Sequence, residues 1–147
     1  MDILNLAAAV CSVLGAIIAI WQAYRAKTFR DEVSRDRTRL MLIDAVGVAR
    51  GARAECQKIM TPVGRRLRGV NEQGVIDAIR ACVERIKDNA HRVSCEELNR
   101  LTAALEARAL TYTSTSGEKE RGEVGDAMYS DLNRVIELLS RRLDEEL

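Results

Sequence analysis

The chain has few aromatic residues and only one proline. Its aromatic residues make up 3% of the sequence. Strands are enriched in aromatic and β-branched residues, so this composition argues against a β-sandwich or a β-barrel. Because Pro62 is the only proline, long helices can run without interruption. Alanine, leucine and arginine are abundant and favour helix. We therefore predict an all-α protein.

The sequence offers little catalytic or metal-binding chemistry. His91 is the only histidine, so no Ser-His-Asp arrangement is supported, and neither a Walker loop nor a G-x-G-x-x-G motif occurs. Cys82, His91 and Cys95 follow no standard zinc spacing and lack a fourth ligand. The four cysteines are expected to be reduced thiols. We predict neither an enzyme nor a bound metal or other cofactor.

Charge is balanced overall but unevenly distributed. Lys and Arg total 23 against 22 for Asp and Glu, which gives a net charge of +1. Residues 1–95 carry 16 basic and 10 acidic groups, whereas residues 96–147 carry 7 basic and 12 acidic groups. The balance excludes a wholesale polybasic protein but leaves room for a local basic patch.

A long uncharged segment opens the chain. Residues 3–24 contain no charged side chain, and as a helix they would reach roughly 33 Å, enough to cross a hydrocarbon core of about 30 Å. Trp21 and Tyr24 close the segment, where an aromatic belt would lie. Basic residues follow at once: Arg25, Lys27 and Arg30. We predict a single transmembrane helix over residues 1–24, with the N-terminus outside and the C-terminal domain in the cytoplasm.

Two other interpretations of this segment remain open. A cleaved signal peptide needs a positively charged start, and here only Met1 and Asp2 precede the run. A buried helix of a soluble bundle is also compatible, because the three alanines at 7–9 make the run only moderately hydrophobic.

One face of the predicted membrane helix is small or polar. Its residues recur at alternating spacings of three and four, and bulky aliphatic side chains occupy the opposite face. Small residues let helix backbones approach each other in a membrane, so we predict self-association through this small-residue face. In an oligomer of four or more chains the face would line a narrow pore, and a plain anchor is the simpler alternative. Its residues are Asn5, Ala8, Ser12, Gly15, Ala19 and Gln22.

The helix is predicted to continue as a juxtamembrane stem over residues 25–60. No proline occurs before Pro62, and the spacing of three and four continues with an interruption at Asp36. The residues that continue it are Phe29, Val33, Leu40, Ile43 and Gly47.

Residues 61–147 are predicted to form a cytosolic helical domain. Asn71 is a candidate cap for a helix over 72–92. The apolar stripe of this helix consists of Val75, Ile76, Ile79, Cys82, Val83 and Ile86. A capping box of the form S-x-x-E begins at Ser94 and starts a helix through about Leu110.

The polar, glycine-containing stretch 113–126 is predicted to be a mobile loop within this domain. The last helix is then expected to begin at Asp126 or Ser130. Its apolar stripe consists of Leu132, Val135, Ile136, Leu139 and Leu143.

A basic segment with intervening glycines is the candidate ligand site. Arginine side chains match phosphate oxygens, and glycines let backbone amides point at an anion. The alternative is that these arginines pair with the acidic C-terminal helices. Apart from Glu55 its charged residues are all basic: Arg50, Arg53, Lys58, Arg65, Arg66 and Arg68.

This layout resembles the small membrane effectors of bacterial antiphage systems, and among them the tetrameric channel effectors of Hailong-type defence. The resemblance rests on the segment ILNLAAAVCSVLGAIIAIWQAYRAKTFRDE and the all-helical remainder, so it covers the chain as a layout. It implies a protein of the bacterial inner membrane, a tetramer and a closed resting pore along the small-residue face. It also implies a nucleotide or oligonucleotide ligand on the basic segment, made by a partner nucleotidyltransferase.

We therefore predict an oligomeric membrane pore, gated by a cytosolic anionic ligand, that depolarises the membrane in antiphage defence. A membrane-anchored scaffold or adaptor without pore activity is the first alternative. A phage lysis component of the spanin kind is the second, but its helical part would lie outside the cytoplasm, which the basic residues after the membrane run argue against.

Overall fold

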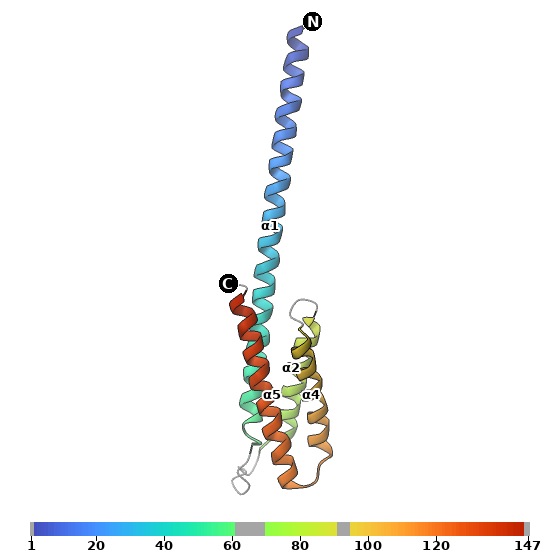
Figure 1. Ribbon diagram of the computed structural model, residues 1–147, viewed down its shortest axis with the longest axis vertical. Coiled ribbons are helices and arrows are strands. Elements are labelled where there is room, and N and C mark those ends of the chain that lie inside the picture. Colours follow the sequence, from blue (N-terminus) through green and yellow to red (C-terminus); the bar gives the residue numbers. More distant parts are fainter. Residues whose placement is uncertain (1, 61–69, 91–94, 146–147) are drawn as a thin grey trace. The chain divides into compact units, whose positions relative to one another are not determined.

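The fold is all-α, as predicted. The computed structural model describes residues 2–60, 70–90 and 95–145, with side chains from residue 12 onward. Within these ranges it contains four helices and no strand (Figure 1). They are α1 (Asp2–Cys56), α2 (Glu72–Asp88), α4 (Glu96–Ser114) and α5 (Glu118–Glu145).

The chain divides into two compact units, Met1–Arg37 and Thr38–Leu147. The predicted boundaries at residues 24/25 and 60/61 therefore differ from the division that the structure shows. The difference arises because residues 42–56 of α1 carry part of the hydrophobic core of the second unit. The C-terminal part of the predicted stem is thus a packed helix of the bundle.

The first unit consists of the N-terminal part of α1. Helix α1 continues without a break to Cys56, as expected for a stretch with no proline. All side chains described between residues 12 and 37 are exposed.

Among the described residues, no helix has the length and apolar character needed to cross a membrane. The side chains of residues 3–11, the first part of the predicted span, lie outside that description.

The second unit is a helical bundle with one hydrophobic core. Side chains at helical spacing along one face of each helix meet in its interior, which removes their apolar area from water. Leu42, Ala45 and Ala49 contribute from α1, where small residues allow the helix to pack closely. The predicted stripes of α2 and α5 are buried except for the half-buried Leu143, and Ile79, Cys82, Leu132 and Leu139 are inaccessible to solvent.

Polar contacts connect α1 to two neighbouring helices of the bundle. Arg53 donates to the Asn133 amide oxygen of α5 at 3.3 Å, and the Cys56 thiol lies 3.6 Å from the Gly125 carbonyl oxygen. Asp44 pairs with Arg85 of α2 at 3.2 Å. These contacts and the shared core hold residues 38–56 of α1 in the bundle.

Helix starts follow local capping chemistry. The Asn71 side chain accepts a hydrogen bond from the Gly74 amide at 3.0 Å, which confirms the predicted cap of α2. Helix α4 is capped by Cys95, whose sulfur accepts from the Leu98 amide at 3.4 Å. The predicted capping residue Ser94 lies outside the described residues.

The predicted loop over 113–126 is wrong. Helix α4 extends to Ser114, only residues 115–117 are non-helical, and α5 begins at Glu118. Gly122 and Gly125 are buried in α5, and a Cβ added to Gly125 would lie 3.4 Å from the Ile59 carbonyl oxygen. These glycines therefore allow close packing of a helix, although the sequence predicted them to lie in a mobile loop.

Candidate functional site

The small-residue face lies on α1, in the Met1–Arg37 unit. Ser12, Gly15, Ala19 and Gln22 are all exposed. The side chains of Asn5 and Ala8 lie outside the described residues. One unbroken helix carries all six positions at spacings of three and four, so they share a face as predicted.

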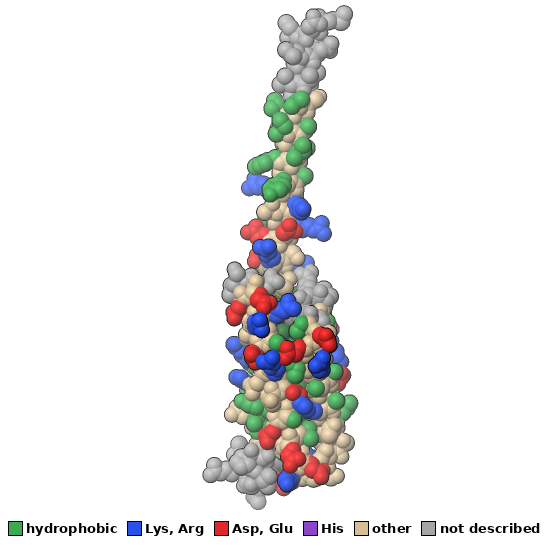
Figure 2. Space-filling view, viewed as in Figure 1, with side chains coloured by type: hydrophobic (Ala, Val, Ile, Leu, Met, Phe, Trp, Pro, Cys, Tyr) green, Lys and Arg blue, Asp and Glu red, His purple; other side chains and the backbone are tan. Residues whose placement is uncertain are grey.

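Bulky apolar side chains are exposed on the same stretch of α1. Figure 2 shows hydrophobic side chains along this stretch, followed by charged side chains. The residues include Val13, Leu14, Ile17, Ile18 and Ile20, each more than half exposed. An isolated stretch of this kind in water would leave much apolar area solvated, so it calls for a lipid or protein partner.

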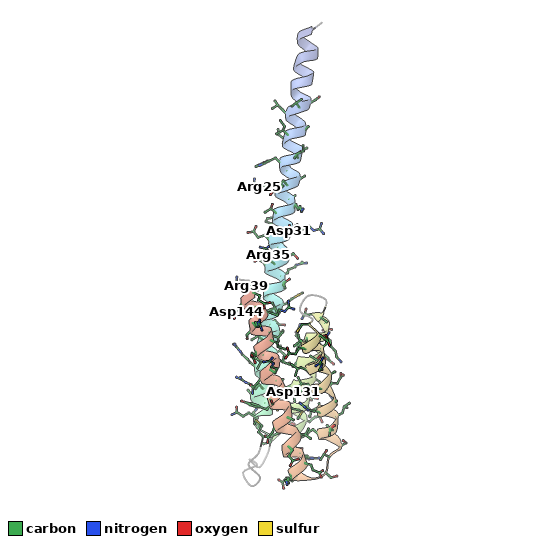
Figure 3. All side chains as sticks on the ribbon, viewed as in Figure 1. Arg25, Asp31, Arg35, Arg39, Asp131 and Asp144 are labelled. Carbon is green, nitrogen blue, oxygen red and sulfur yellow. The ribbon has the colours of Figure 1, made fainter. Side chains whose placement is uncertain are left out.

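An aromatic and basic border follows this apolar stretch. The Arg25 guanidinium lies 5.4 Å from the centre of the Trp21 ring, a cation–π geometry. Tyr24 is exposed one residue before it. Figure 3 labels Arg25, Asp31 and Arg35, whose charged side chains extend from the next turns. Trp and Tyr beside arginine are typical of a membrane–water interface.

Three glycines of α1 have no neighbour packed against them among the described residues. A Cβ added to Gly15, Gly47 or Gly51 would have no other heavy atom within 4 Å. Glycine inside a helix costs about 0.5–1 kcal/mol relative to alanine, so such positions need an external reason. Close approach of another helix is a reason that fits all three positions.

The apolar stripe also continues on the bundle part of α1. Leu40 is 66% exposed and Ile43 is 48% exposed, although both belong to a helix whose other face is packed in the core. Both residues and Gly47 were predicted to lie on the stem, but not as part of a functional site. Their spacing of three and four was the signal that could have identified them.

Among its described members, Arg50, Arg53 and Lys58, the basic segment is not gathered into one site. Arg50 is exposed, Arg53 donates to Asn133, and Lys58 pairs with Glu55 at 2.5 Å. The remaining predicted residues, Arg65, Arg66 and Arg68, lie outside the described residues. Within the described ranges, Arg50 is therefore the member of the segment that is most available to an external anion.

Other arginines connect the helices of the bundle. The Arg108 guanidinium pairs with the Asp131 carboxylate and also donates to the Ala127 carbonyl oxygen at 3.1 Å. Arg121 pairs with Glu72 at 3.1 Å, and its guanidinium also lies over the Tyr112 ring. Arg134 hydrogen-bonds to Glu97 and Glu137, which raises its pKa. These ion pairs are made by arginines outside the basic segment, whereas the described segment residue Arg53 contacts α5 through the Asn133 amide oxygen.

A groove of about 260 Å³ lies between α2 and α4. Its charged lining residues are Arg80, Glu84 and Glu106, so glutamates outnumber arginine. Glu106 is itself paired with Lys87 at 2.6 Å. This lining disfavours an anionic ligand, and Leu110 at its edge offers an exposed apolar side chain.

The buried thiols of the bundle are poor nucleophiles. Burial and, to a lesser extent, the charge of Asp126 raise the pKa of Cys56 from 9.0 to about 12. Burial raises the pKa of Cys82 to about 11. The described part of the chain holds no group of three or more metal-ligating side chains.

The exposed side of α1 within the Met1–Arg37 unit is therefore the candidate functional site. It combines bulky apolar side chains, the unfilled position of Gly15 and an aromatic-basic border. Comparisons with protein-family models, curated proteins and solved structures find no match for this chain.

Proposed function

We propose that the protein is a membrane-anchored oligomer whose copies meet through the small-residue face of α1. The N-terminal part of α1 would span the bacterial inner membrane once, with the N-terminus outside and the bundle in the cytoplasm. The observation that carries this proposal is the exposure of apolar side chains along Val13–Ile20, next to glycine and alanine positions that nothing in the chain fills. Lipid would cover the bulky side chains, and other copies would cover the small ones.

The oligomer is proposed to act as a pore. Ser12 and Gln22 lie on the small-residue face, where a ring of four copies would place hydroxyl and amide groups around an axis. A nucleotide or oligonucleotide bound by the basic segment would control the pore, with Arg50 the exposed residue available to it. Release of the pore would depolarise the membrane, the outcome expected of an antiphage effector.

Ion flux through liposomes tests the pore directly. Ser12→Leu places an apolar side chain on the proposed pore axis, so it should abolish flux while leaving the amount of inserted protein unchanged. Ile17→Leu conserves the volume of a side chain on the bulky face, so it is the matched control and should conduct like the parent chain. Flux that is equal in Ser12→Leu and the parent would contradict a pore along this face.

The orientation has its own test. Arg25, Lys27 and Arg30 follow the uncharged run, whereas Asp2 is the charged residue before it. A reporter active only in the cytoplasm should therefore work after Leu147 and fail ahead of Met1. The reverse result would favour a spanin-like lysis component.

An anchored scaffold is the second candidate function. It is favoured by the groove between α2 and α4, where the Leu110 side chain is 57% exposed. If liposomes containing the parent chain pass no ions with or without nucleotides, the scaffold becomes the proposal to keep. Leu110→Glu should then abolish binding of a partner protein. Lys119→Glu, an exposed substitution on α5, is the control and should leave the partner bound.

A further inference from the structure

We infer that the bundle part of α1 also contacts a second copy of this chain, with the two helices parallel and in register. The contact surface is the outer face of α1, defined here as Leu40, Ile43, Gly47 and the flanking Arg39 and Asp44. The inference rests on the proposed function in one respect, because a shared membrane holds the copies parallel. It goes further by naming a second, extramembrane interface and its register.

The outer face is apolar where the bundle leaves it uncovered. Residues Leu42, Ala45 and Val46 point into the core, whereas Leu40 and Ile43 remain exposed. Gly47 lies on the same face, and a Cβ added to it would have no described side chain or neighbouring helix within 4 Å. A helix that crosses here could therefore approach closely and cover both large side chains.

The spacing along α1 predicts the geometry of that contact. Leu40, Ile43 and Gly47 follow one another at intervals of three and four, which places them on a single seam. Within the Met1–Arg37 unit, Phe29 and Val33 follow the same spacing, which Asp36 interrupts, and they are 67% and 41% exposed. A repeat of 3.5 residues is typical of left-handed coiled coils, whose helices run nearly parallel.

Charges beside the seam indicate that the occupant is another copy. In a parallel, in-register pair, the residue that precedes Leu40 or Val33 on one helix lies next to a residue of the partner helix whose number is five higher. Arg39 of one copy would then meet Asp44 of the other, and Glu32 would meet Arg37 in the same way. Both pairs are of opposite charge, and all four side chains are exposed. Asp44 retains a surface pair with Arg85, at 3.2 Å, that leaves its side chain half exposed.

A third pair of this kind is of like charge. Arg25 would meet Arg30 of the second copy. This pair lies directly after the predicted membrane segment, where anionic headgroups can act as counter-ions. The two pairs of opposite charge lie on the C-terminal side of this one along α1.

Cysteine cross-linking in vesicles tests the register. The background for this experiment is the full-length chain with the substitutions Cys11→Ala and Cys95→Ser. The two cysteines that remain, Cys56 and Cys82, are buried. Ile43→Cys in this background should form disulfide-linked dimers on mild oxidation, because in-register copies bring the same position together. Leu110→Cys is the matched control on α4, exposed but off the seam, and should stay monomeric.

Two comparisons separate this inference from the proposed function. Gly15→Cys reports on the membrane part of α1. If Gly15→Cys cross-links and Ile43→Cys does not, the membrane oligomer stands and the in-register contact of the outer face is overturned. If only Ile43→Cys cross-links, the outer-face contact is supported and the membrane association is overturned. If neither cross-links, both fail.

A charge exchange tests the identity of the occupant. Glu32→Arg should lower the yield of Ile43→Cys dimers, because two arginines would then meet across the seam. Adding Arg37→Glu to the same chain should restore the yield. No restoration, or cross-linking of Ile43→Cys to a protein of different mass, would overturn a second copy as the occupant.

Discussion

Glycines in this chain have opposite surroundings that their sequence context does not reveal. Gly125 is buried in α5 against the backbone of Ile59, whereas Gly47 is exposed with nothing near it. In the sequence, Gly117, Gly122 and Gly125 lie among polar residues, which led to the prediction of a loop. A glycine that permits a close helix contact and one that permits a turn look alike in a single sequence, because the contact partner is remote along the chain.

Replacing Gly125 tests whether its small size is required. Gly125→Leu should destabilise the bundle by about 1–3 kcal/mol, because the added atoms would clash with Ile59. Gly125→Ala is the control and should be tolerated, since its single Cβ makes an ordinary contact at 3.4 Å. Urea unfolding followed by circular dichroism measures both. Equal stability of the leucine variant and the parent would contradict the packing of α5 against Ile59.

The cysteines should differ in reactivity and in their dependence on pH. Cys56 and Cys82 are buried with raised pKa values, so native protein should be alkylated first at Cys95 among these three. A thiol whose pKa is raised in the folded state makes its full contribution to stability below the unfolded-state pKa of 9.0. This contribution is lost as the pH rises towards 11–12. The unfolding free energy should thus fall above pH 9, by at most about 1.4 kcal/mol per pH unit for each thiol.

Mass mapping of alkylated peptides checks the order of reaction, and denaturant titrations at pH 8 and above check the trend. Cys56→Ala should weaken the pH dependence above pH 9, because it removes one of the two titrating thiols. Modification of Cys56 at the same rate as Cys95 in the native state would contradict its burial.

At the scale of helices, apolar periodicity predicted most of the bundle. Val75 and Ile79 in α2 and Leu132 and Leu139 in α5 repeat at helical spacing, and all are buried. The periodicity did not predict how α1 divides between two units, because Leu40 and Leu42 are equally apolar and only the fold decides which of them is covered. The extension of α5 to Glu118 was missed because glycines among polar residues are typical of loops.

Arg108 and Asp131 should be the most important ion pair between α4 and α5. The Asp131 side chain is only 14% exposed, and Arg108 also donates to a backbone carbonyl. Asp131→Ala should therefore cost about 1–3 kcal/mol, since it leaves a partly buried guanidinium without its carboxylate. Glu96→Ala removes an exposed pair with Arg100 and should cost no more than about 0.5 kcal/mol. Thermal unfolding of the two variants compares them, and equal losses would contradict this ranking.

At the scale of the whole molecule, the sequence identified an exposed helix face but not a ligand site. The small-residue face follows from spacing alone, because spacing within one helix determines which residues share a side. The basic segment could not be resolved in the same way. Arg53 donates a hydrogen bond to Asn133 of α5, and Lys58 pairs with Glu55. The contact between Arg53 and Asn133 depends on tertiary packing, because the two residues are far apart in the sequence. The sequence pattern of this chain indicates an external partner only through apolar and glycine positions that the chain itself leaves uncovered.

The number of copies in a lipid bilayer tests the central claim most directly. Native mass spectrometry of the full-length chain released from lipid nanodiscs should give a closed oligomer, with four copies expected. Gly15→Leu should reduce the number of copies, because it fills the space through which helix backbones approach, whereas Ile17→Leu on the bulky face should leave it unchanged. A single copy of the parent chain in the bilayer, or a chain that stays out of it, would contradict assembly through α1.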